Sequence, residues 1–211
     1  MKDIVIIGAG GFAKEVAFLI DEINNDELEW NLLGFIDEEK QIKSKYSIIN
    51  SDNWLINHKS ELSVAFGIGN PELLSSIYEK IKKNKKLRFP NLIHPNCVGD
   101  WERIKLGKGN IICASNTFTT DIQIKDFNII NLDCTIGHDV KIGNFNVINP
   151  SVNMSGGVTI QNKVLLGTSS TILQYKNICD STIIGAGAVV TKDIIESGIY
   201  IGSPAKKMIK E

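Results

Sequence analysis

The side chain best suited to proton transfer in this sequence is His138, which is followed directly by Asp139. An imidazole changes its charge near neutral pH, so it acts as a general base more readily than other side chains. The chain has two other histidines, His58 and His94, and both lie outside the repetitive tract that surrounds His138. His138 is therefore the candidate catalytic base. A single histidine is weak evidence by itself, so the assignment depends on the structural elements that surround it.

A glycine-rich turn is the second candidate for chemistry. Residues 8–13 read Gly-Ala-Gly-Gly-Phe-Ala, which satisfies the G-x-G-x-x-G/A pattern between an expected strand at 4–7 and an expected helix at 12–24. In such a turn, backbone N–H groups at the helix start face a phosphate. Gly10, Gly11 and the neighbouring Phe12 are thus candidate substrate-binding residues. The alternative is a tight turn with a purely structural role.

Two further strand ends share this edge of the expected sheet. Asp37 and Glu38 follow a strand expected at 32–36, where an acidic side chain can bond a ribose hydroxyl or a base N–H. Gly69 follows a strand expected at 64–68. A full dinucleotide fold needs about six strands in two halves, and this part of the chain has room for one half. We therefore expect a mononucleotide diphosphate, such as the head of a nucleotide sugar, rather than NAD.

A period of six governs the second half of the chain. Large apolar residues recur at every sixth position, which fits neither a helix nor a two-faced strand. They are Leu106, Ile112, Phe118, Ile124, Ile130, Ile136, Ile142, Ile148, Met154, Ile160, Leu166, Ile172, Ile178, Ile184 and Val190. A hexapeptide repeat is typical of a parallel β-helix, in which three hexads make one triangular coil. His138 stands two positions after Ile136, which places it near an outward corner.

These patterns divide the chain into two domains. Residues 1–93 alternate strands with helices, at 12–24 and from 71 to about 84, and predict a small Rossmann-like parallel α/β sheet. Within it, Trp54 is expected in a loop. Residues 94–211 are expected to form the all-β parallel β-helix and a C-terminal tail.

Composition excludes several classes of protein. The formal net charge is -1 and the pI about 6.3, which gives no electrostatic reason to expect a nucleic-acid partner. No apolar run is long enough to span a membrane, and nothing at the N-terminus resembles a signal peptide. The four cysteines lack CxxC spacing, so we expect reduced thiols and a cytoplasmic protein.

Together these segments resemble a known family over essentially the whole chain. The hexad tract, the segment Ile-Gly-His-Asp at 136–139, INPSVNMSGGVTI at 148–160, IIGAGAVVTKDI at 183–194 and GSPAKKM at 202–208 are similar to bacterial sugar acetyltransferases of the left-handed β-helix superfamily. IIGAGGFAKEVAFLI at 6–20, GFIDEE at 34–39 and FGIGNPELL at 66–74 resemble the nucleotide-sugar-binding domain of the NeuD- and PglD-like subgroup. That subgroup includes nucleotide-sugar N-acetyltransferases and sialic acid O-acetyltransferases.

The resemblance assigns roles at the acceptor side of the site. His138 matches the family's general base, and Asp139 matches the acid that orients and charges it. Asn131 matches an asparagine near the acceptor group. The resemblance also implies a left-handed β-helix.

It assigns a donor side as well. Gly156, one full coil beyond His138, matches a glycine whose N–H faces the thioester oxygen of acetyl-CoA. Thr168 and Ala186 match positions whose backbone binds the pantetheine arm. In the family, acetyl-CoA lies in the groove between neighbouring subunits of a homotrimer, and no metal takes part.

Two positions depart from the family pattern. The family often has histidine where this chain has Phe12, which suggests a different acceptor or closer kinship with the O-acetylating members. It often has a second histidine where this chain has Val147, so a polar contact to the donor is lost here.

The resulting expectation is an acetyl-CoA-dependent N-acetyltransferase. Its acceptor would be the amino group of a dTDP- or UDP-linked 4-amino-4,6-dideoxy sugar used in O-antigen, capsule or glycan synthesis. One alternative keeps the enzyme and acetylates a hydroxyl of sialic acid or another surface sugar. Another is a catalytically silent nucleotide-sugar-binding protein. A β-helical carbonic anhydrase would need three zinc-binding histidines, and two of the three here lie outside the hexad tract.

Overall fold

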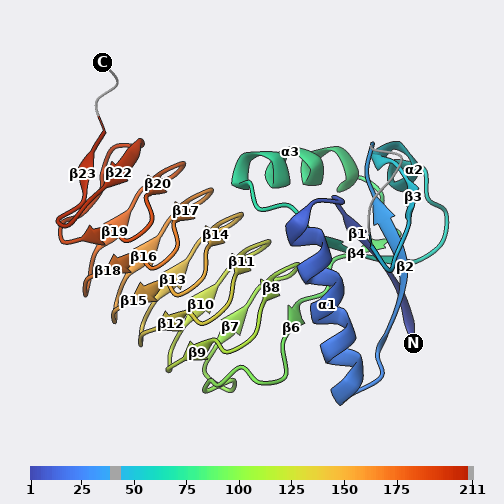
Figure 1. Ribbon diagram of the computed structural model, residues 1–211, viewed down its shortest axis with the longest axis horizontal. Helices are drawn as coiled ribbons and strands as arrows, with labels where there is room; N and C mark the ends of the chain where they lie inside the picture. The colour runs from blue at the N-terminus through green and yellow to red at the C-terminus, as the bar shows by residue number, and fades with distance from the viewer. Residues whose placement is uncertain (39–43, 209–211) are drawn as a thin grey trace.

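The N-terminal part of the computed structural model, which describes residues 1–38 and 44–208, is a parallel sheet flanked by helices (Figure 1). Glu39 of the GFIDEE segment and the last three residues of the expected tail lie outside the described residues. The sheet has the strand order β3-β2-β1-β4-β5. Its strands are β1 (Lys2–Ile7), β2 (Trp30–Ile36), β3 (Ile48–Asn50), β4 (Leu62–Phe66) and β5 (Leu87–Arg88). The order reverses between β1 and β4, where ligands bind in sheets of this kind.

The helices follow the apolar spacing of the sequence. α1 (Gly11–Asp26) buries Ala13, Val16, Ala17, Leu19 and Ile20. α3 (Pro71–Ile81) begins at the expected residue and is capped by Asn70, whose Oδ1 accepts from the Leu73 N–H at 2.9 Å. A third helix, α2 (Asp52–Ile56), holds Trp54, so the expected loop at this position was wrong. Such a short helix cannot show helical periodicity in the sequence.

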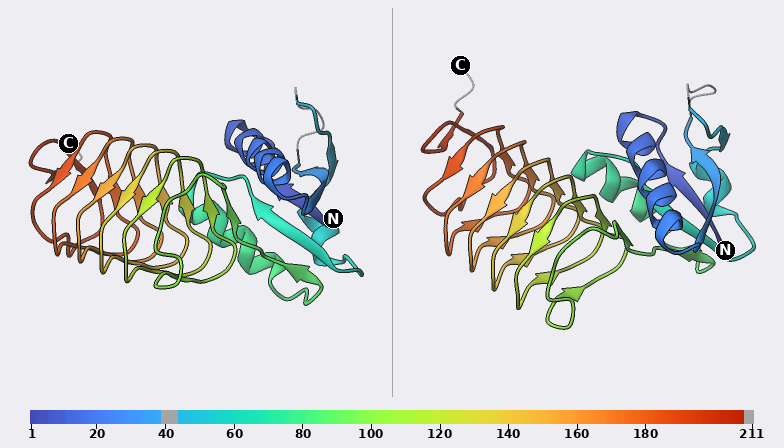
Figure 2. Two further views of the ribbon diagram at one scale, coloured as in Figure 1. Left: turned by 90° about the horizontal axis from the view of Figure 1, so that it is seen from below. Right: turned by 60° about the horizontal axis from the view of Figure 1, so that its bottom comes forward.

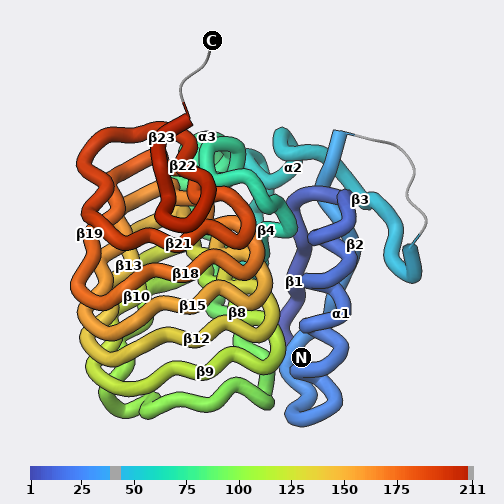
Figure 3. Tube along the Cα trace, turned by 60° about the vertical axis from the view of Figure 1, so that its left-hand side comes forward, coloured from blue at the N-terminus to red at the C-terminus, as the bar shows by residue number. Residues whose placement is uncertain are grey.

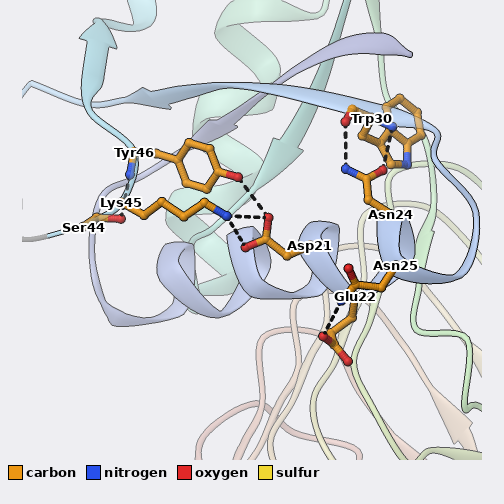
Figure 4. A network of polar contacts seen from close by, with 8 residues as sticks. All are labelled: Asp21, Glu22, Asn24, Asn25, Trp30, Ser44, Lys45 and Tyr46. Atoms are coloured by element: carbon orange, nitrogen blue, oxygen red, sulfur yellow. Dashed lines mark hydrogen bonds and ion pairs between the residues drawn. The ribbon is translucent and has the colours of Figure 1, made fainter.

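Polar contacts fix the C-terminal half of α1 to its surroundings (Figure 4). The Asn24 side chain accepts from the Trp30 N–H at 2.8 Å and donates to the Trp30 carbonyl at 2.8 Å. Asp21 accepts from Lys45 Nζ at 3.0 Å and from Tyr46 Oη at 2.9 Å. These contacts hold α1 against β2 and the segment after residue 43, and so fix the direction of the glycine turn at the other end of the helix.

The C-terminal part is a β-helix with three parallel faces (Figures 1 and 2). Each face is named here by one strand: the β7 sheet, the β8 sheet and the β9 sheet. The β7 sheet contains β7 (Lys105–Leu106), β10 (Gln123–Ile124), β13 (Lys141–Ile142), β16 (Thr159–Ile160) and β19 (Asn177–Ile178). The β9 sheet contains β9 (Thr117–Phe118), β12 (Thr135–Ile136), β15 (Asn153–Met154), β18 (Thr171–Ile172) and β21 (Val189–Val190).

The β8 sheet is the longest face. It contains β6 (Leu92–Ile93), β8 (Ile111–Ile112), β11 (Ile129–Ile130), β14 (Val147–Ile148), β17 (Leu165–Leu166), β20 (Ile183–Ile184), β22 (Ile199–Ile201) and the antiparallel β23 (Lys206–Lys207). Because β6 pairs with β8, the β-helical hydrogen bonding begins at Leu92, two residues before the expected boundary at 94.

The period of six is confirmed residue by residue. Ile124 pairs with Ile142 and Ile142 with Ile160, so three hexads make one coil, as expected. The second residue of each strand from β7 to β21 points inward, and a left-handed residue closes each corner at every sixth position from Gly109 to Gly187. Asparagines bridge successive coils inside one corner: Asn110 Oδ1 accepts from Asn128 Nδ2 at 3.1 Å, and Asn128 Oδ1 accepts from Asn146 Nδ2 at 2.9 Å.

The N-terminal domain covers the outer face of the β8 sheet from β8 to β17, whereas Ile183 of β20 and Ile199 of β22 are exposed. Ile111, Ile129 and Val147 project from that sheet into the core of the N-terminal domain. At one edge of the sheet, the Tyr78 ring of α3 lies 4.2 Å from the Phe127 ring, measured between centroids. Figure 3 shows α1 beside one edge of the β9 sheet and the β7 strands at its other edge. Within the described residues, no helix combines the length and apolar character needed to cross a membrane.

Candidate active site

His138 and Asp139 form a hydrogen-bonded pair on one corner of the β-helix. This corner, called the His138 corner, joins the β9 sheet to the β7 sheet and includes residues 119–121, 137–139, 155–157 and 173–175. His138 Nδ1 lies 2.8 Å from Asp139 Oδ2, and both side chains are exposed, at 46% and 62%. A carboxylate at Nδ1 favours the tautomer with its proton there, which leaves Nε2 free to accept one.

Asp139 reaches this position because of the corner geometry. Its φ is +61°, in the left-handed series that closes every hexad, and its N–H donates to the Thr120 carbonyl of the preceding coil at 3.2 Å. Aspartate tolerates this conformation better than bulkier residues do. The repeat therefore turns the carboxylate back toward the imidazole that precedes it.

Gly156 lies against the imidazole on the next coil. A Cβ at position 156 would stand 2.4 Å from His138 Nε2, so only glycine fits beside the ring as it is placed. In the described part of the chain, the Gly156 N–H donates to no backbone or side-chain acceptor, whereas Gly157 N–H donates to the His138 carbonyl at 2.7 Å. A free N–H thus lies on the turn that packs against the candidate base.

Hollows flank the pair on both sides. On the β9 sheet, a hollow of about 220 Å³ is bordered by Thr135, Gly137, Asn153 and Ser155, among others. On the β7 sheet, a polar hollow of about 350 Å³ includes Asp139, Lys105 and Lys141. His138 stands on the ridge between them, with space for a ligand on either side.

The remaining β-helical candidates lie at a different corner. Asn131, Thr168 and Ala186 belong to the corner between the β8 and β9 sheets, called the Asn131 corner. Gly187 N–H donates to the Thr168 carbonyl at 2.8 Å, and the Asn131 side chain accepts from the Leu132 N–H at 2.8 Å. The full width of the β9 sheet separates them from His138 and Gly156, so one chain does not bring the two groups together.

The N-terminal candidates surround a cleft at the switch point of the sheet. It has a volume of about 390 Å³ and is lined by Ile7, Gly8, Ala9, Gly10, Ile36, Asp37, Glu38, Asp52, Gly67, Ile68, Leu73, Ile77 and Lys80. The cleft brings Gly10, Asp37 and Glu38 together, as the sequence predicts. Gly11, Phe12 and Gly69 are not among its lining residues, and Phe12 packs partly against the core of the N-terminal domain.

The glycines around this cleft fall into two groups. Gly8 has φ +97°, and a Cβ on Gly67 would stand 2.6 Å from Ala13, so the fold itself requires glycine at both positions. At Gly10, Gly11 and Gly69 a Cβ would meet nothing within 4 Å, and none of the three has a positive φ. The chain therefore has no internal need for glycine there, which favours close approach of a ligand to the backbone.

Sequence patterns missed two charged residues in the cleft. Asp52 enters it from α2 and Lys80 from α3. Burial raises the pKa of the Asp52 carboxyl, the Lys80 ammonium opposes that change, and the nearby Glu38 and Asp37 add to it. Asp52 was overlooked because α2 gave no helical signal.

Two other positions have structural roles. Cys134 is buried inside the β-helix, its thiol lies 3.3 Å from the Asn149 carbonyl oxygen, and burial raises the pKa of that thiol to about 12. Val147 is 3% exposed and packs in the core between the domains, so its side chain is not accessible to a ligand. Among the described residues, no group of three or more His, Cys, Asp or Glu side chains is arranged to hold a metal ion.

Comparisons with known proteins agree with both halves of this architecture. Residues 3–81 match the PglD N-terminal domain family. PerB from Caulobacter crescentus, solved with CoA and GDP-perosamine, is 27% identical, with a TM-score of 0.88 over 98% of this chain and 97% of that one. Residues 3–81 therefore form a PglD N-terminal domain, and the whole chain has the same fold as PerB.

Two other solved structures are similar to almost the whole chain. The acetyltransferase domain of PglB from Neisseria gonorrhoeae, solved with acetyl coenzyme A, is 26% identical, with a TM-score of 0.88 over 98% of this chain and 99% of that one. WeeI from Acinetobacter baumannii is 23% identical, with a TM-score of 0.85 over 98% of this chain and 99% of that one. At this identity the similarity supports the fold alone. The similarity extends across both domains, so the relative arrangement of the two domains resembles that in PerB and PglB.

Proposed function

We propose that this protein transfers the acetyl group of acetyl-CoA to the amino group of a nucleotide-linked 4-amino-4,6-dideoxy sugar. The observation that carries the proposal is the His138–Asp139 pair at 2.8 Å with Nε2 against Gly156. The N-terminal cleft would hold the nucleotide, with its diphosphate at Gly10 and Gly11. Similarity to PerB, solved with both CoA and GDP-perosamine, supports this pairing of donor and acceptor.

The geometry supports general-base catalysis. His138 Nε2 would accept the proton of the amine as its nitrogen attacks the thioester carbonyl carbon. Asp139 would stabilise the imidazolium, and the free Gly156 N–H would donate to the oxyanion. When the intermediate collapses, the C–S bond breaks, and His138 returns the proton to the departing thiolate. The acyl group passes directly to the amine without an acyl-enzyme.

The distribution of these residues supports a site shared between subunits. His138, Asp139 and Gly156 lie on the corner opposite the face that carries the N-terminal domain of the same chain. Asn131, Thr168 and Ala186 lie on the corner next to that domain. In a homotrimer with cyclic symmetry, the His138 corner of each subunit would face the Asn131 corner and the nucleotide cleft of the next. Each active site would then combine donor and acceptor contacts from two subunits.

The setting of the reaction follows from the same features. Free cysteines at all four positions suit a reducing compartment, so we place the enzyme in the cytoplasm, in the synthesis of an O-antigen, capsule or other glycan. The acidic residues Asp37 and Glu38 would bond the ribose or the base.

Turnover of a substrate panel tests this proposal. UDP-, dTDP- and GDP-linked 4-amino sugars, each with acetyl-CoA, would be assayed by release of the CoA thiol, and the product amide identified by mass spectrometry. Acetylation of one amino sugar nucleotide is the expected outcome. Exclusive acetylation of a sialic acid hydroxyl would contradict the N-acetyltransferase assignment, and nucleotide-sugar binding without any turnover would favour a silent binding protein.

A further inference from the structure

Tyr175 is an aromatic residue in a conformation that its own packing does not explain. Its φ is +58°, in the left-handed region that bulky side chains rarely adopt. The residue is nevertheless 61% exposed. Within the described residues, its hydroxyl takes part in no hydrogen bond, and its ring contacts no other aromatic ring.

The other aromatic residues in left-handed corner positions have a clear reason to be there. Phe127 is 1% exposed, and its ring stacks on Phe145 at 5.3 Å between centroids. The Tyr78 ring packs against both, so this pair forms the aromatic part of the contact between the β-helix and α3. Burial offsets the conformational cost for these two residues. Tyr175 adopts the same unfavourable backbone conformation, but little of the residue is buried. This difference points to a contact between Tyr175 and a molecule outside the chain.

The position of Tyr175 indicates what that contact is. A Cβ on Gly157 would stand 2.1 Å from Tyr175 Cδ1, so the ring lies directly on the Gly157 backbone. Gly156, the preceding residue, packs in the same way against the His138 imidazole. The imidazole, the free Gly156 N–H and the Tyr175 ring therefore form one continuous strip along the His138 corner, which runs from the base toward the C-terminal coils.

We infer that the Tyr175 ring is a binding platform for the pantetheine arm of acetyl-CoA. The inference rests on the proposed function, in which Gly156 N–H donates to the thioester oxygen. Two methylene groups separate the sulfur of that thioester from the first amide of the arm, a reach similar to the coil spacing of roughly 4.8 Å. The amide and methylene groups would then lie over the exposed face of the ring, which buries apolar surface on both sides.

Binding of CoA alone to the full-length protein, measured by calorimetry, tests the inference without an acceptor. Tyr175→Asn removes the ring but keeps a residue that tolerates positive φ, so the backbone is preserved. We expect its Kd for CoA to rise about three- to tenfold. Tyr175→Phe keeps the platform and should restore the affinity to within about twofold of the wild type.

Trp101 supplies a matched control. It is a partly exposed aromatic residue, at 40%, on the same corner but toward the N-terminal coils, where its ring packs on Phe118 at 5.6 Å between centroids. Trp101→Ala should change the Kd for CoA by less than about twofold. A larger loss in Trp101→Ala than in Tyr175→Asn would overturn the assigned direction of the arm.

The remaining outcomes are distinct. Wild-type affinity in Tyr175→Asn would overturn the inference while leaving the proposed function intact. A loss in Tyr175→Phe as large as that in Tyr175→Asn would assign the contact to the hydroxyl and overturn the platform. Failure of the wild-type protein to bind CoA at all would overturn the proposed function itself, and the inference with it.

Discussion

The imidazole of His138 occupies the space that a side chain at position 156 would fill. A Cβ on Gly156 would lie 2.4 Å from Nε2, 2.5 Å from Cε1 and 2.9 Å from Cδ2 of that ring. The two residues are three hexads apart in the chain and meet because three hexads make one coil of the β-helix. The candidate base and the candidate oxyanion donor are thus held together by the repeat itself.

Gly156→Ala should therefore reduce activity more than stability. The added methyl group would push the His138 ring aside, and the ring can move into solvent without disturbing the core. Because the base would then be misplaced, we expect kcat to fall by about 10²-fold or more. Gly143→Ala is the contrasting variant, because its Cβ would stand 2.4 Å from the Gln161 carbonyl oxygen. That oxygen belongs to the backbone of the next coil, which cannot move without disturbing the β-helix. Thermal unfolding should show a loss of stability in Gly143→Ala and little change in Gly156→Ala. The reverse pattern would contradict the packing argument.

Removal of the base should reduce turnover without unfolding the protein. His138→Ala should lower kcat by about 10²- to 10⁴-fold at saturating substrates, since His138 is exposed and supports no core contact. Asp139→Asn should have a smaller effect in the same direction, because the imidazole remains but its tautomer and charge are less well stabilised. Near-wild-type turnover of His138→Ala at neutral pH would rule out the proposed mechanism.

Mixed oligomers should recover activity from two inactive variants. His138→Ala damages one corner of the β-helix, and Gly10→Val damages the nucleotide cleft on the opposite side of the same chain. If each site uses both regions from different subunits, co-refolded mixtures will contain sites with neither defect. We expect turnover in the mixture to exceed that of both parents, and the protein to sediment at three times its chain mass of 23.3 kDa. A fully active 23.3 kDa monomer would disprove the shared site.

A substitution in the glycine turn should weaken binding of the acceptor and leave binding of acetyl-CoA unchanged. Gly10 has φ -74° and ψ -170°, which valine can adopt, and a Cβ there would meet nothing within 4 Å. Gly10→Val should raise the KM of the sugar nucleotide strongly, because the branched side chain would occupy the phosphate position, while the KM of acetyl-CoA stays nearly constant. Gly67→Ala, which would clash with Ala13 at 2.6 Å, should instead destabilise the fold by about 1–3 kcal/mol. Equal KM values in Gly10→Val and wild type would show that the turn is structural.

The buried thiols predict a stability loss at alkaline pH. Burial raises the pKa of Cys113 and Cys134 to about 12, above the value of about 9 expected in the unfolded chain. The unfolded state therefore loses these protons first, so the contribution of the two thiols to stability should be fully present below about pH 9 and be lost as the pH rises toward 12. Urea unfolding across this range measures the effect. In the same range the less buried Cys179 should react first with an alkylating reagent, and prior labelling of Cys134 would contradict its burial.

Much of the architecture could be predicted because it depends on local repetition. The apolar residue of every hexad points inward, and the two main helices begin within one residue of their expected starts. The start of α3 at Pro71 and the cleft around Gly10, Asp37 and Glu38 also follow from short-range patterns. Asp52 and Lys80 were missed because their positions depend on how α2 and α3 pack over the sheet.

The sequence by itself determined the coils, the α/β sheet and the identity of the candidate base, since each depends on residue types at fixed spacings. Only the tertiary structure decided which of these residues share a site. Asn131 and His138 are close together in the chain, yet a corner turn after each strand sends them to opposite edges of the β9 sheet. Gly156 is much farther along the chain from His138 and packs against it. In a β-helix, residues at the same position of successive coils lie side by side, because strands pair between coils and not within them. Residues that are close along the chain can therefore lie farther apart than residues one coil away.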